Sequence, residues 1–311
     1  MKSLICGSIA YDSIMVFQDH FKNHLLPDQL HILNVCFFVP EMRREFGGCA
    51  GNIAYNLKLL GGEPVIMATV GDDSGPYMKR LKQLDLDTTH VSEVPGTFTA
   101  QAFITTDLDD NQITAFHPGA MMQAHQNHVG DAKGIALGIV APDGRDAMLQ
   151  HAAGFKAAGV PFIFDPGQGL PMFNGEELLA FIKQADYCTV NDYEAKLLCE
   201  RTGLTLEQLA THVKALIVTL GAEGSDIYAD GKITKIACVK PEAILDPTGC
   251  GDAYRSGLLY GITNAWDWQK TGQLASLMGS IKIAHRGGQN HTPDRAEIAR
   301  RYSEAFGSQL W

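Results

Sequence analysis

The segment DPTGCGDAYRSG, residues 246–257, is the most informative stretch of this 311-residue chain. Gly249 and Gly251 lead into a helical pattern that carries Asp252 in its first turn. Glycines let the main chain approach a ligand closely, and the free N–H groups of a first helical turn, together with the helix dipole, attract an anion. We therefore predict an anion hole for a transferring phosphoryl group, formed by the amides of this turn, that of Cys250 included. Asp252 could accept the proton of an attacking hydroxyl, or it could merely cap the helix.

Two other phosphate-binding motifs do not fit this chain. In a dinucleotide-binding GxGxxG pattern, the third glycine would fall on Tyr254, and no βαβ unit is expected to begin there. A P-loop needs the pattern GxxxxGK[ST], which the sequence does not contain. The anion hole is therefore expected to belong to neither class.

Strands and helices alternate through the rest of the chain. From residue 138 onward, buried strands such as FIFD, YCTV and ALIVTLG alternate with helices over short links. Such alternation predicts a parallel sheet that is covered by helices on both faces. Further strands are expected at 1–7 and 64–70, and further helices at 47–62, 74–84, 249–262 and 267–285. Together these elements predict a single α/β domain over residues 1–311.

Two stretches, residues 13–46 and 96–118, do not fit the alternation. Thr97–Thr106 and Ile113–Phe116 alternate in hydrophobicity around an Asp-Asp-Asn turn, which predicts a β-hairpin, and Leu30–Val39 is expected to be extended. Open α/β sheets bind ligands at the carboxyl ends of their strands. We predict that both stretches form a small, discontinuous β-strand lid over that edge of the sheet.

Residues 246–252 resemble the C-terminal signature DTxGAGD of the PfkB, or ribokinase-like, carbohydrate kinases, and they differ from it at Pro247 and Cys250. Four further segments match motifs of this family in the family's order: GSIAYD (7–12), FGGCAGNIA (46–54), NDYE (191–194) and TLGAEG (219–224). The resemblance implies a ribokinase-like three-layer α/β/α sandwich with a mostly parallel central sheet and a small β-strand lid. It also implies ATP-dependent phosphorylation of a hydroxyl group on a sugar-containing substrate.

The N-terminal matches resemble the sugar site of the family. Gly47 and Gly48 can hinge a lid and let a sugar ring lie against the backbone, and Asn52 is then placed to hydrogen-bond sugar hydroxyls. By the same resemblance Asp12 holds two hydroxyls, and a carboxylate suits a vicinal diol because it accepts both protons. Without the resemblance, the glycine pair would be an ordinary turn before a helix, and Asp12 an ordinary loop residue.

The later matches imply a nucleotide site. The residues expected to contact ATP are Asn191, Thr219, Gly221 and Gly224. Glu194 is expected to organise Mg²⁺ through water, because Mg²⁺ keeps much of its water shell. Alternatively, Glu194 is a first-turn glutamate that is favoured by the helix dipole. The expected cofactor is MgATP, and K⁺ is a candidate second ion.

The lid sequence favours a nucleoside as the substrate. Residues 97–117 contain no lysine or arginine that could neutralise a second phosphate, and their phenylalanines could stack on a flat base or form the lid's own core. The chain resembles the bacterial adenosine and nucleoside kinase branch of the family. That resemblance implies a base bordered by Ser8, Cys36, Phe116 and Gln168. Ala102 stands where some relatives have a bulky aromatic, which predicts a roomier pocket and activity on several purine nucleosides.

Two alternatives to a nucleoside kinase remain open. One is a sugar kinase of the same family that acts on ribose or fructose. The other is a nucleoside-sensing protein that keeps the pocket without turnover. Intact glycines and an intact Asp252 argue against the sensor.

Three further groups of side chains have two interpretations each. Arg255 could reach a phosphate or pair with a structural acid. The Cys250 thiol lies at a helix N-terminus, which is expected to lower its pKa, and we hypothesise that its oxidation or alkylation blocks phosphate access. The histidine pairs 20/24 and 125/128 have metal-like spacing but no third ligand cluster, so they are expected to be solvated loop residues.

Composition excludes several classes of partner. The formal net charge is −10 at pH 7, and no lysine or arginine cluster occurs, which argues against nucleic acids and acidic membranes. No apolar run approaches the ~20 residues of a membrane helix, and the N-terminus lacks a signal-peptide pattern. Seven scattered cysteines without a CxxC pair suggest a reducing compartment, so we expect a cytoplasmic protein. The apolar face of the lid makes a homodimer a candidate assembly.

Overall fold

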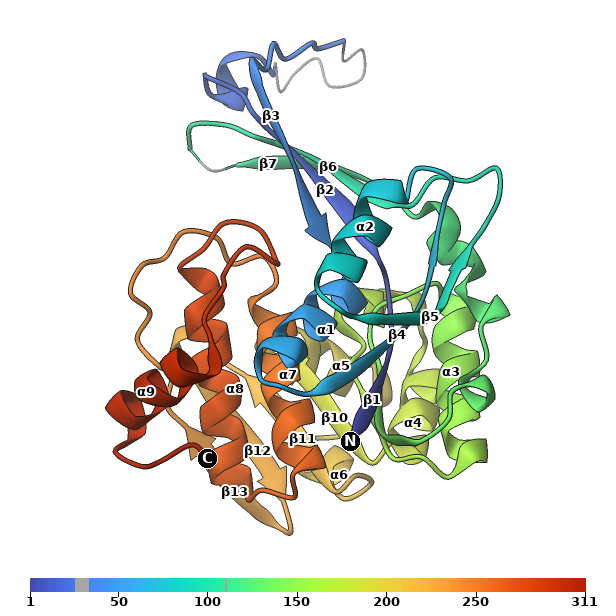
Figure 1. Cartoon of the computed structure of the whole chain (residues 1–311), viewed down its shortest axis with the longest axis vertical. Helices are drawn as coiled ribbons and strands as arrows, with labels where there is room; N and C mark the ends of the chain where they lie inside the picture. The colour runs from blue at the N-terminus through green and yellow to red at the C-terminus, as the bar shows by residue number, and fades with distance from the viewer. Residues whose placement is uncertain (26–33, 110) are drawn as a thin grey trace.

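Nine strands form the central sheet, in the order β13-β12-β11-β10-β9-β8-β1-β4-β5 (Figure 1). This computed structural model describes residues 1–25, 34–109 and 111–311. The strands are β1 (Lys2–Cys6), β4 (Glu63–Val70), β5 (Asp87–Glu93), β8 (Ile135–Val140), β9 (Phe162–Phe164), β10 (Tyr187–Asn191), β11 (Ala215–Thr219), β12 (Ser225–Ala229) and β13 (Lys232–Ile236). Neighbours from β5 to β11 run parallel, whereas β12 and β13 are antiparallel.

Helices cover both faces of this sheet. One layer contains α1 (Cys49–Leu59), α2 (Gly75–Gln83), α7 (Cys250–Thr263) and α8 (Trp268–Ile283). The other contains α3 (Arg145–Ala158), α4 (Gly175–Gln184), α5 (Asp192–Thr202) and α6 (Leu206–Ala210). Successive strand residues point to opposite faces, so Ile5 packs in the first core and Cys6 in the second. The last helix, α9 (Arg295–Phe306), packs on α8.

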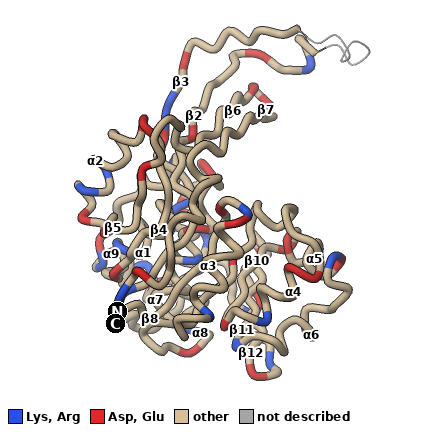
Figure 2. The backbone as a smooth tube through the Cα atoms, turned by 90° about the vertical axis from the view of Figure 1, so that its right-hand side faces the viewer, with Lys and Arg blue, Asp and Glu red and all other residues tan. Residues whose placement is uncertain are grey.

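A second, smaller sheet projects from the first (Figures 1 and 2). Its order is β3 (Glu41–Gly47), β2 (Ala10–Val16), β6 (Ala100–Thr106) and β7 (Gln112–His117). Strand β2 follows β1 after the short link 7–9 and lies between β3 and β6, so segments that are distant in sequence share one sheet. Of the segment expected to be extended, residues 30–33 lie outside the described residues, and 34–39 form no strand. The turn residue at position 110 also lies outside them.

The predicted architecture is confirmed: the chain forms a three-layer α/β/α sandwich with a mostly parallel sheet, and a small sheet of β-strands projects from it. Strand β5 was not predicted. Its sequence, DTTHVSE, is half-buried along its length at the sheet edge, so it lacks both an apolar run and a clean alternation. Among the helices in the described part of the chain, none is long and apolar enough to span a bilayer.

Candidate active site

The predicted site residues collect at the carboxyl edge of the parallel strands. Ser8 lies just after β1, Asn191 ends β10 and Thr219 ends β11. The last two are paired in the strand register, so both motifs begin side by side. Open α/β sheets bind ligands at this edge, and the lid projects from it (Figure 1).

The first turn of α7 presents main-chain amides where the anion hole is predicted. Gly249 is the N-cap and has φ 78°, a left-handed conformation that glycine adopts without strain. The Cys250 N–H donates to the Pro247 carbonyl at 3.1 Å, so this amide is engaged within the protein. The amides of Gly249, Gly251 and Asp252 are therefore the ones that can face a ligand, and Gly251 is exposed.

The Asp252 carboxylate faces helix α1 and is half-buried. Its Oδ2 accepts a hydrogen bond of 2.8 Å from the Asn52 amide, which lies on α1 and is itself buried. Burial raises the pKa of Asp252 from 3.8 to about 6, and the charge of Asp165 adds to the rise, while the Asn52 hydrogen bond and Arg255 oppose it. A carboxylate with this pKa is ionised at neutral pH and remains a competent proton acceptor.

A chain of buried hydrogen bonds links Asn52 to the glycine pair. The Gln289 amide nitrogen donates to Asn52 Oδ1 at 3.1 Å and to the Tyr77 hydroxyl at 2.7 Å. Tyr77 in turn donates to the Gly47 carbonyl at 2.7 Å. Because Gln289 donates to the Asn52 side-chain oxygen, the Asn52 side-chain nitrogen is the atom that faces Asp252. Sequence reasoning missed Tyr77 and Gln289, and no local motif around either residue could have revealed them.

Asp12 lies on the lid strand that is anchored to this network. A Cβ atom on Gly47 would lie 2.4 Å from Asp12 Oδ2, so only glycine permits this approach. Burial raises the pKa of Asp12 to about 6, and the charges of Asp246 and Glu45 add to the rise. Gly48 lies equally close to the backbone of residues 8–10, where a Cβ would come within 2.6 Å of Ser8 O. Gly48 is thus required by backbone packing, whereas at Gly47 a side chain would collide with the Asp12 carboxylate.

The residues predicted around the base are less concentrated. Ser8 Oγ accepts a hydrogen bond from the Cys49 N–H at 3.1 Å, so it helps to cap α1. Phe116 lies on β7 in the same register row as Asp12, with Ala102 between them, and it is 53% exposed. Cys36 and Gln168 are exposed, the first on the lid and the second after β9. Among the described residues, no hydrogen bond or strand pairing joins Ser8, Cys36, Phe116 and Gln168 to one another.

On the nucleotide side, Asn191 and Glu194 form a capping box at the start of α5. The Glu194 carboxylate accepts the Asn191 N–H at 2.8 Å and the Asn191 amide nitrogen at 2.9 Å. Burial raises the pKa of Glu194, and the nearby Arg255 counteracts the rise. Thr219 Oγ1 donates to the Val190 carbonyl, which ties the two strand ends together. Glu194 therefore caps a helix here, as one of its two interpretations predicted.

The loop glycines after β11 have different roles. Gly224 has φ 97° and lies so close to β13 that a Cβ would come within 2.0 Å of the Ile236 carbonyl. Gly221 has φ 57° and open space where its Cβ would be. Gly224 is thus required by the turn. Of these two glycines, Gly221 is the one with open space beside it that a ligand could enter.

Arg255 pairs with a structural acid. Its guanidinium donates to both oxygens of Asp165, at 2.9 and 3.0 Å, and both residues are buried. Such a two-bond pair leaves little of the guanidinium for a phosphate. Asp165 was not predicted as part of the site, although its charge reaches Asp252.

The expected lowering of the Cys250 pKa was wrong. Burial raises the pKa of this thiol to about 11, and the charges of Asp246 and Asp252 add to the rise, while the nearby Lys282 ammonium opposes it. The thiol is therefore protonated at neutral pH, which makes it a poor nucleophile.

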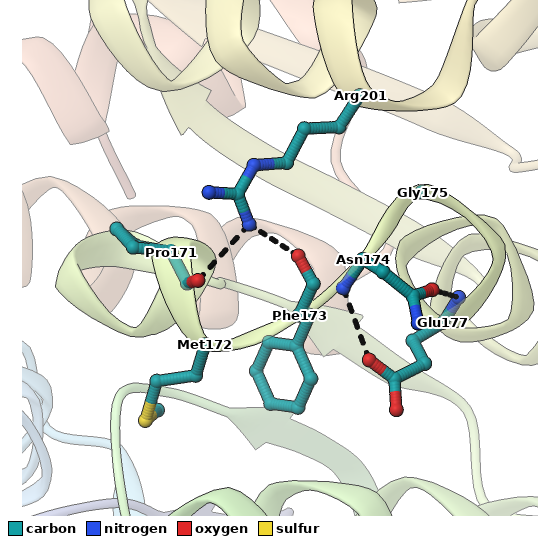
Figure 3. A pocket seen from close by; sticks show the side chains of 7 residues that line it. All are labelled: Pro171, Met172, Phe173, Asn174, Gly175, Glu177 and Arg201. Atoms are coloured by element: carbon teal, nitrogen blue, oxygen red, sulfur yellow. Dashed lines mark hydrogen bonds between the residues drawn. The ribbon is translucent and has the colours of Figure 1, made fainter.

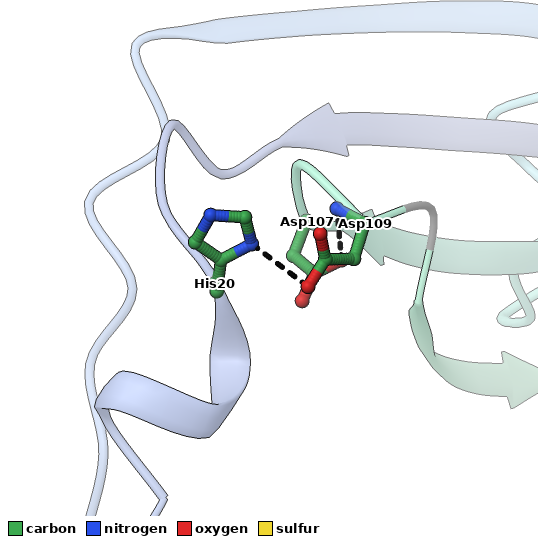
Figure 4. A group of neighbouring side chains, drawn as sticks. All are labelled: His20, Asp107 and Asp109. Carbon is green, nitrogen blue, oxygen red and sulfur yellow. Dashed lines mark hydrogen bonds and ion pairs between the residues drawn. The ribbon is translucent and has the colours of Figure 1, made fainter.

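Two clusters away from this edge are structural. At the lid tip, His20 pairs with Asp109 at 3.0 Å (Figure 4). Lys22 contacts the same carboxylate. Asp107 beside them accepts the Phe21 N–H, so the group ties two lid loops together. In the helix layer that contains α4 and α5, Arg201 donates to the carbonyls of Pro171 and Phe173, in the loop before α4, and these residues line a shallow pocket (Figure 3).

The chain is similar to known kinases over almost its whole length. The model of the pfkB family carbohydrate kinases matches residues 12–295. A nucleoside kinase from Methanocaldococcus jannaschii is 31% identical over 275 residues, which cover 86% of this chain and 89% of that protein. The structure of a nucleoside kinase from Burkholderia thailandensis in complex with inosine superposes with a TM-score of 0.91 at 55% identity and covers 99% of both chains. The structure of the M. jannaschii enzyme gives a TM-score of 0.89 at 29% identity, over 97% of this chain and 98% of that one.

Proposed function

Because this chain belongs to the pfkB family of carbohydrate kinases, we propose that it transfers a phosphoryl group from ATP to the ribose 5′-hydroxyl of purine nucleosides, adenosine among them. The nucleoside kinases from M. jannaschii and B. thailandensis support this choice of substrate class. One observation carries the proposal. Asp252, at the amide end of α7, is hydrogen-bonded to Asn52, and Asn52 shares a network with the glycine that touches Asp12.

In the proposed reaction, Asp252 accepts the hydroxyl proton as the oxygen attacks the γ-phosphorus and the bond to ADP breaks. Its pKa of about 6 suits this role, because a general base works best when its pKa lies just below the working pH. The amides at the start of α7 stabilise the charge on the transferring group. Fixed donors of this kind contribute because they need no reorganisation during the reaction.

The sugar is held by the lid and by α1. Asp12 accepts the two protons of the ribose diol, and the Asn52 oxygen or nitrogen contacts a hydroxyl when the lid closes. The network through Gln289 and Tyr77 keeps Asn52 in place before the substrate arrives. Prior positioning of this kind lowers the entropic cost of reaching the reactive geometry.

Magnesium is proposed to bind beside Asn191 and Glu194, whose oxygens are the ligand type that this ion prefers. Both Glu194 oxygens accept hydrogen bonds from Asn191, so a contact through water is the form that leaves the cap intact. When bound, Mg²⁺ would neutralise part of the phosphate charge.

The base pocket is proposed to accept several purines, including adenosine, inosine and guanosine. Ala102 lies between Asp12 and Phe116 in the lid register, where its side chain takes less room than the bulky aromatic of some relatives. The B. thailandensis enzyme, which shares 55% of its sequence with this chain, has been solved with inosine and with ADP-inosine. The product, a nucleoside monophosphate, would suit a role in purine salvage.

The test is ADP release from MgATP with adenosine, inosine, guanosine, ribose and fructose, with the product identified by mass spectrometry. Nucleoside-dependent release of ADP supports the proposal. Release with free sugars alone would assign the chain to the sugar kinases, and nucleoside binding without release would make it a sensor. Activity confined to adenosine would refute the roomy base pocket. Asp252→Asn is the catalytic control, and Asp131→Asn, an exposed aspartate outside the site, is its matched partner.

A further inference from the structure

The only fully buried lysine in the described residues lies beneath the anion hole. Lys282, near the end of α8, has 0% exposure. Its Nζ donates to the main-chain carbonyls of Asp246 at 2.7 Å and His285 at 3.0 Å. Burying an ammonium group is costly unless polar partners compensate it. Here the partners are neutral carbonyls rather than a carboxylate, so the position of Lys282 needs an explanation beyond simple ion pairing.

The two carbonyls belong to two loops, one that precedes α7 and one that follows α8. Asp246 opens the loop that leads to Gly249, and His285 precedes the Gly287-Gly288 pair. The Asp246 side chain joins the same two segments, since it accepts the Thr248 N–H at 2.9 Å and the Gly287 N–H at 2.8 Å. The Lys282 ammonium and the Asp246 side chain therefore hold the loop before α7 against the loop after α8.

These loops directly shape the amide hole. A Cβ on Gly249 would lie 3.2 Å from the Cα of Gly288, and a Cβ on Gly288 would lie 2.4 Å from Asn52 Oδ1. A change in the spacing of the two loops would therefore displace both the N-terminus of α7 and the residue that holds Asp252. Lys282 affects the reacting groups only through the packing of these two loops. It is therefore a positioning residue.

The charge of Lys282 also acts on the site. Burial lowers its pKa, whereas the negative charges of Asp246 and Asp252 favour the ammonium form. The Lys282 ammonium in turn helps to lower the pKa of Asp246. Its positive charge lies on the protein side of the α7 N-terminus and adds to the helix dipole there.

Main-chain carbonyls that converge at 2.7–3.0 Å on one point are also the ligand set that proteins use for K⁺. We propose that Lys282 is a built-in cation that takes the place of a bound monovalent ion, so that this chain organises its anion hole without K⁺. The proposal rests on the kinase function proposed above and replaces the expectation that K⁺ is a second ion.

The first experiment uses the wild-type protein. Its nucleoside-dependent ADP release is measured in Tris and choline chloride free of K⁺ and NH₄⁺, and again with KCl at equal ionic strength. We expect the same kcat in both buffers. A kcat that rises several-fold with K⁺ would overturn the proposal.

The second experiment uses Lys282→Met, which keeps the volume and removes the charge. Without K⁺, we expect kcat to fall by about 10- to 100-fold, and KCl or NH₄Cl to restore part of it. The matched control is Lys183→Met, at an exposed lysine on α4, which should behave as wild type in both buffers. Full activity of Lys282→Met without K⁺ would overturn the proposal, as would a loss that cations do not relieve in a variant that folds.

Failure of this inference can be told from failure of the kinase proposal. If the wild type releases no ADP with any substrate, the kinase proposal fails, and the same comparison is made on ADP binding by calorimetry. Cation-independent ADP binding by wild type and cation-dependent binding by Lys282→Met would then still support the built-in cation. If Lys282→Met does not fold, the wild-type comparison decides.

Discussion

Replacing Asp252 by asparagine is expected to stabilise the folded chain while it removes most of the activity. The carboxyl group has an ordinary pKa of 3.8, and burial raises it to about 6 in the folded chain. Asparagine has nearly the same size, and its oxygen can still accept the 2.8 Å hydrogen bond from Asn52. The main difference between the two proteins is therefore the charge.

The magnitude follows from the pKa shift. A raised carboxyl pKa means that the folded chain holds the proton more tightly than the unfolded chain. Near pH 4 and below, the group is protonated or nearly so in the folded chain, and its charge has little effect. As the pH rises from about 4 to 6, stability is lost, because the unfolded chain releases this proton while the folded chain still holds it; above 6 the loss is complete, and folding places a charge in a poorly hydrated site. A shift of about two units costs roughly 3 kcal/mol above that range. The variant lacks this cost.

Urea unfolding of wild type and Asp252→Asn measures the difference. At about pH 8, the free energy of unfolding of the variant should exceed that of wild type by up to about 3 kcal/mol, and the gap should close near pH 4. In the ADP-release assay, kcat should fall by about 100- to 10,000-fold. The control Asp131→Asn should change neither quantity. A variant that is less stable than wild type at about pH 8, or one with near-normal turnover, would refute the reasoning.

Three further predictions concern single side chains. The kcat/KM of the wild type should rise with pH through an apparent pKa near 6 and then level off, because Asp12 and Asp252 must both lose protons; a flat profile between pH 5 and 8 would contradict this. Gly47→Ala should raise the nucleoside KM by about tenfold or more, because its Cβ would displace the Asp12 carboxylate, whereas Gly130→Ala, which has open space around it, should leave KM unchanged. Iodoacetamide at pH 7 should act equally on wild type and on Cys250→Ala, because the raised pKa of Cys250 keeps that thiol protonated; rapid inactivation that Cys250→Ala abolishes would show a reactive thiol instead.

Local patterns predicted most of the fold correctly. The helix expected at 249–262 is α7 (Cys250–Thr263), and the strand expected at 64–70 is β4 (Glu63–Val70). These elements have strong apolar periodicity and clear glycine or capping signals at their ends, which act within a few residues. Strand β5 was missed because its pairing with β4, rather than its own composition, makes it a strand.

The candidate site was predicted in outline only. Motif glycines and Asp252 could be found because a helix start and its amides are local features. Tyr77, Gln289 and Lys282 could not be found, because each acts through contacts with segments far away in the sequence. The pKa of Cys250 was predicted with the wrong sign, since the helix terminus is visible in the sequence and burial is not.

The sequence by itself determined where most strands, helices and glycine turns occur, because hydrogen bonds and side-chain periodicity within a dozen residues decide these. Only the tertiary structure decided which polar groups meet and how much water they keep. The hydrogen bond from Asn52 to Asp252 joins residues 200 positions apart, and the burial that raises the Asp252 pKa comes from several elements at once. Such contacts and desolvation depend on the whole packed chain, so no single segment of the sequence encodes them.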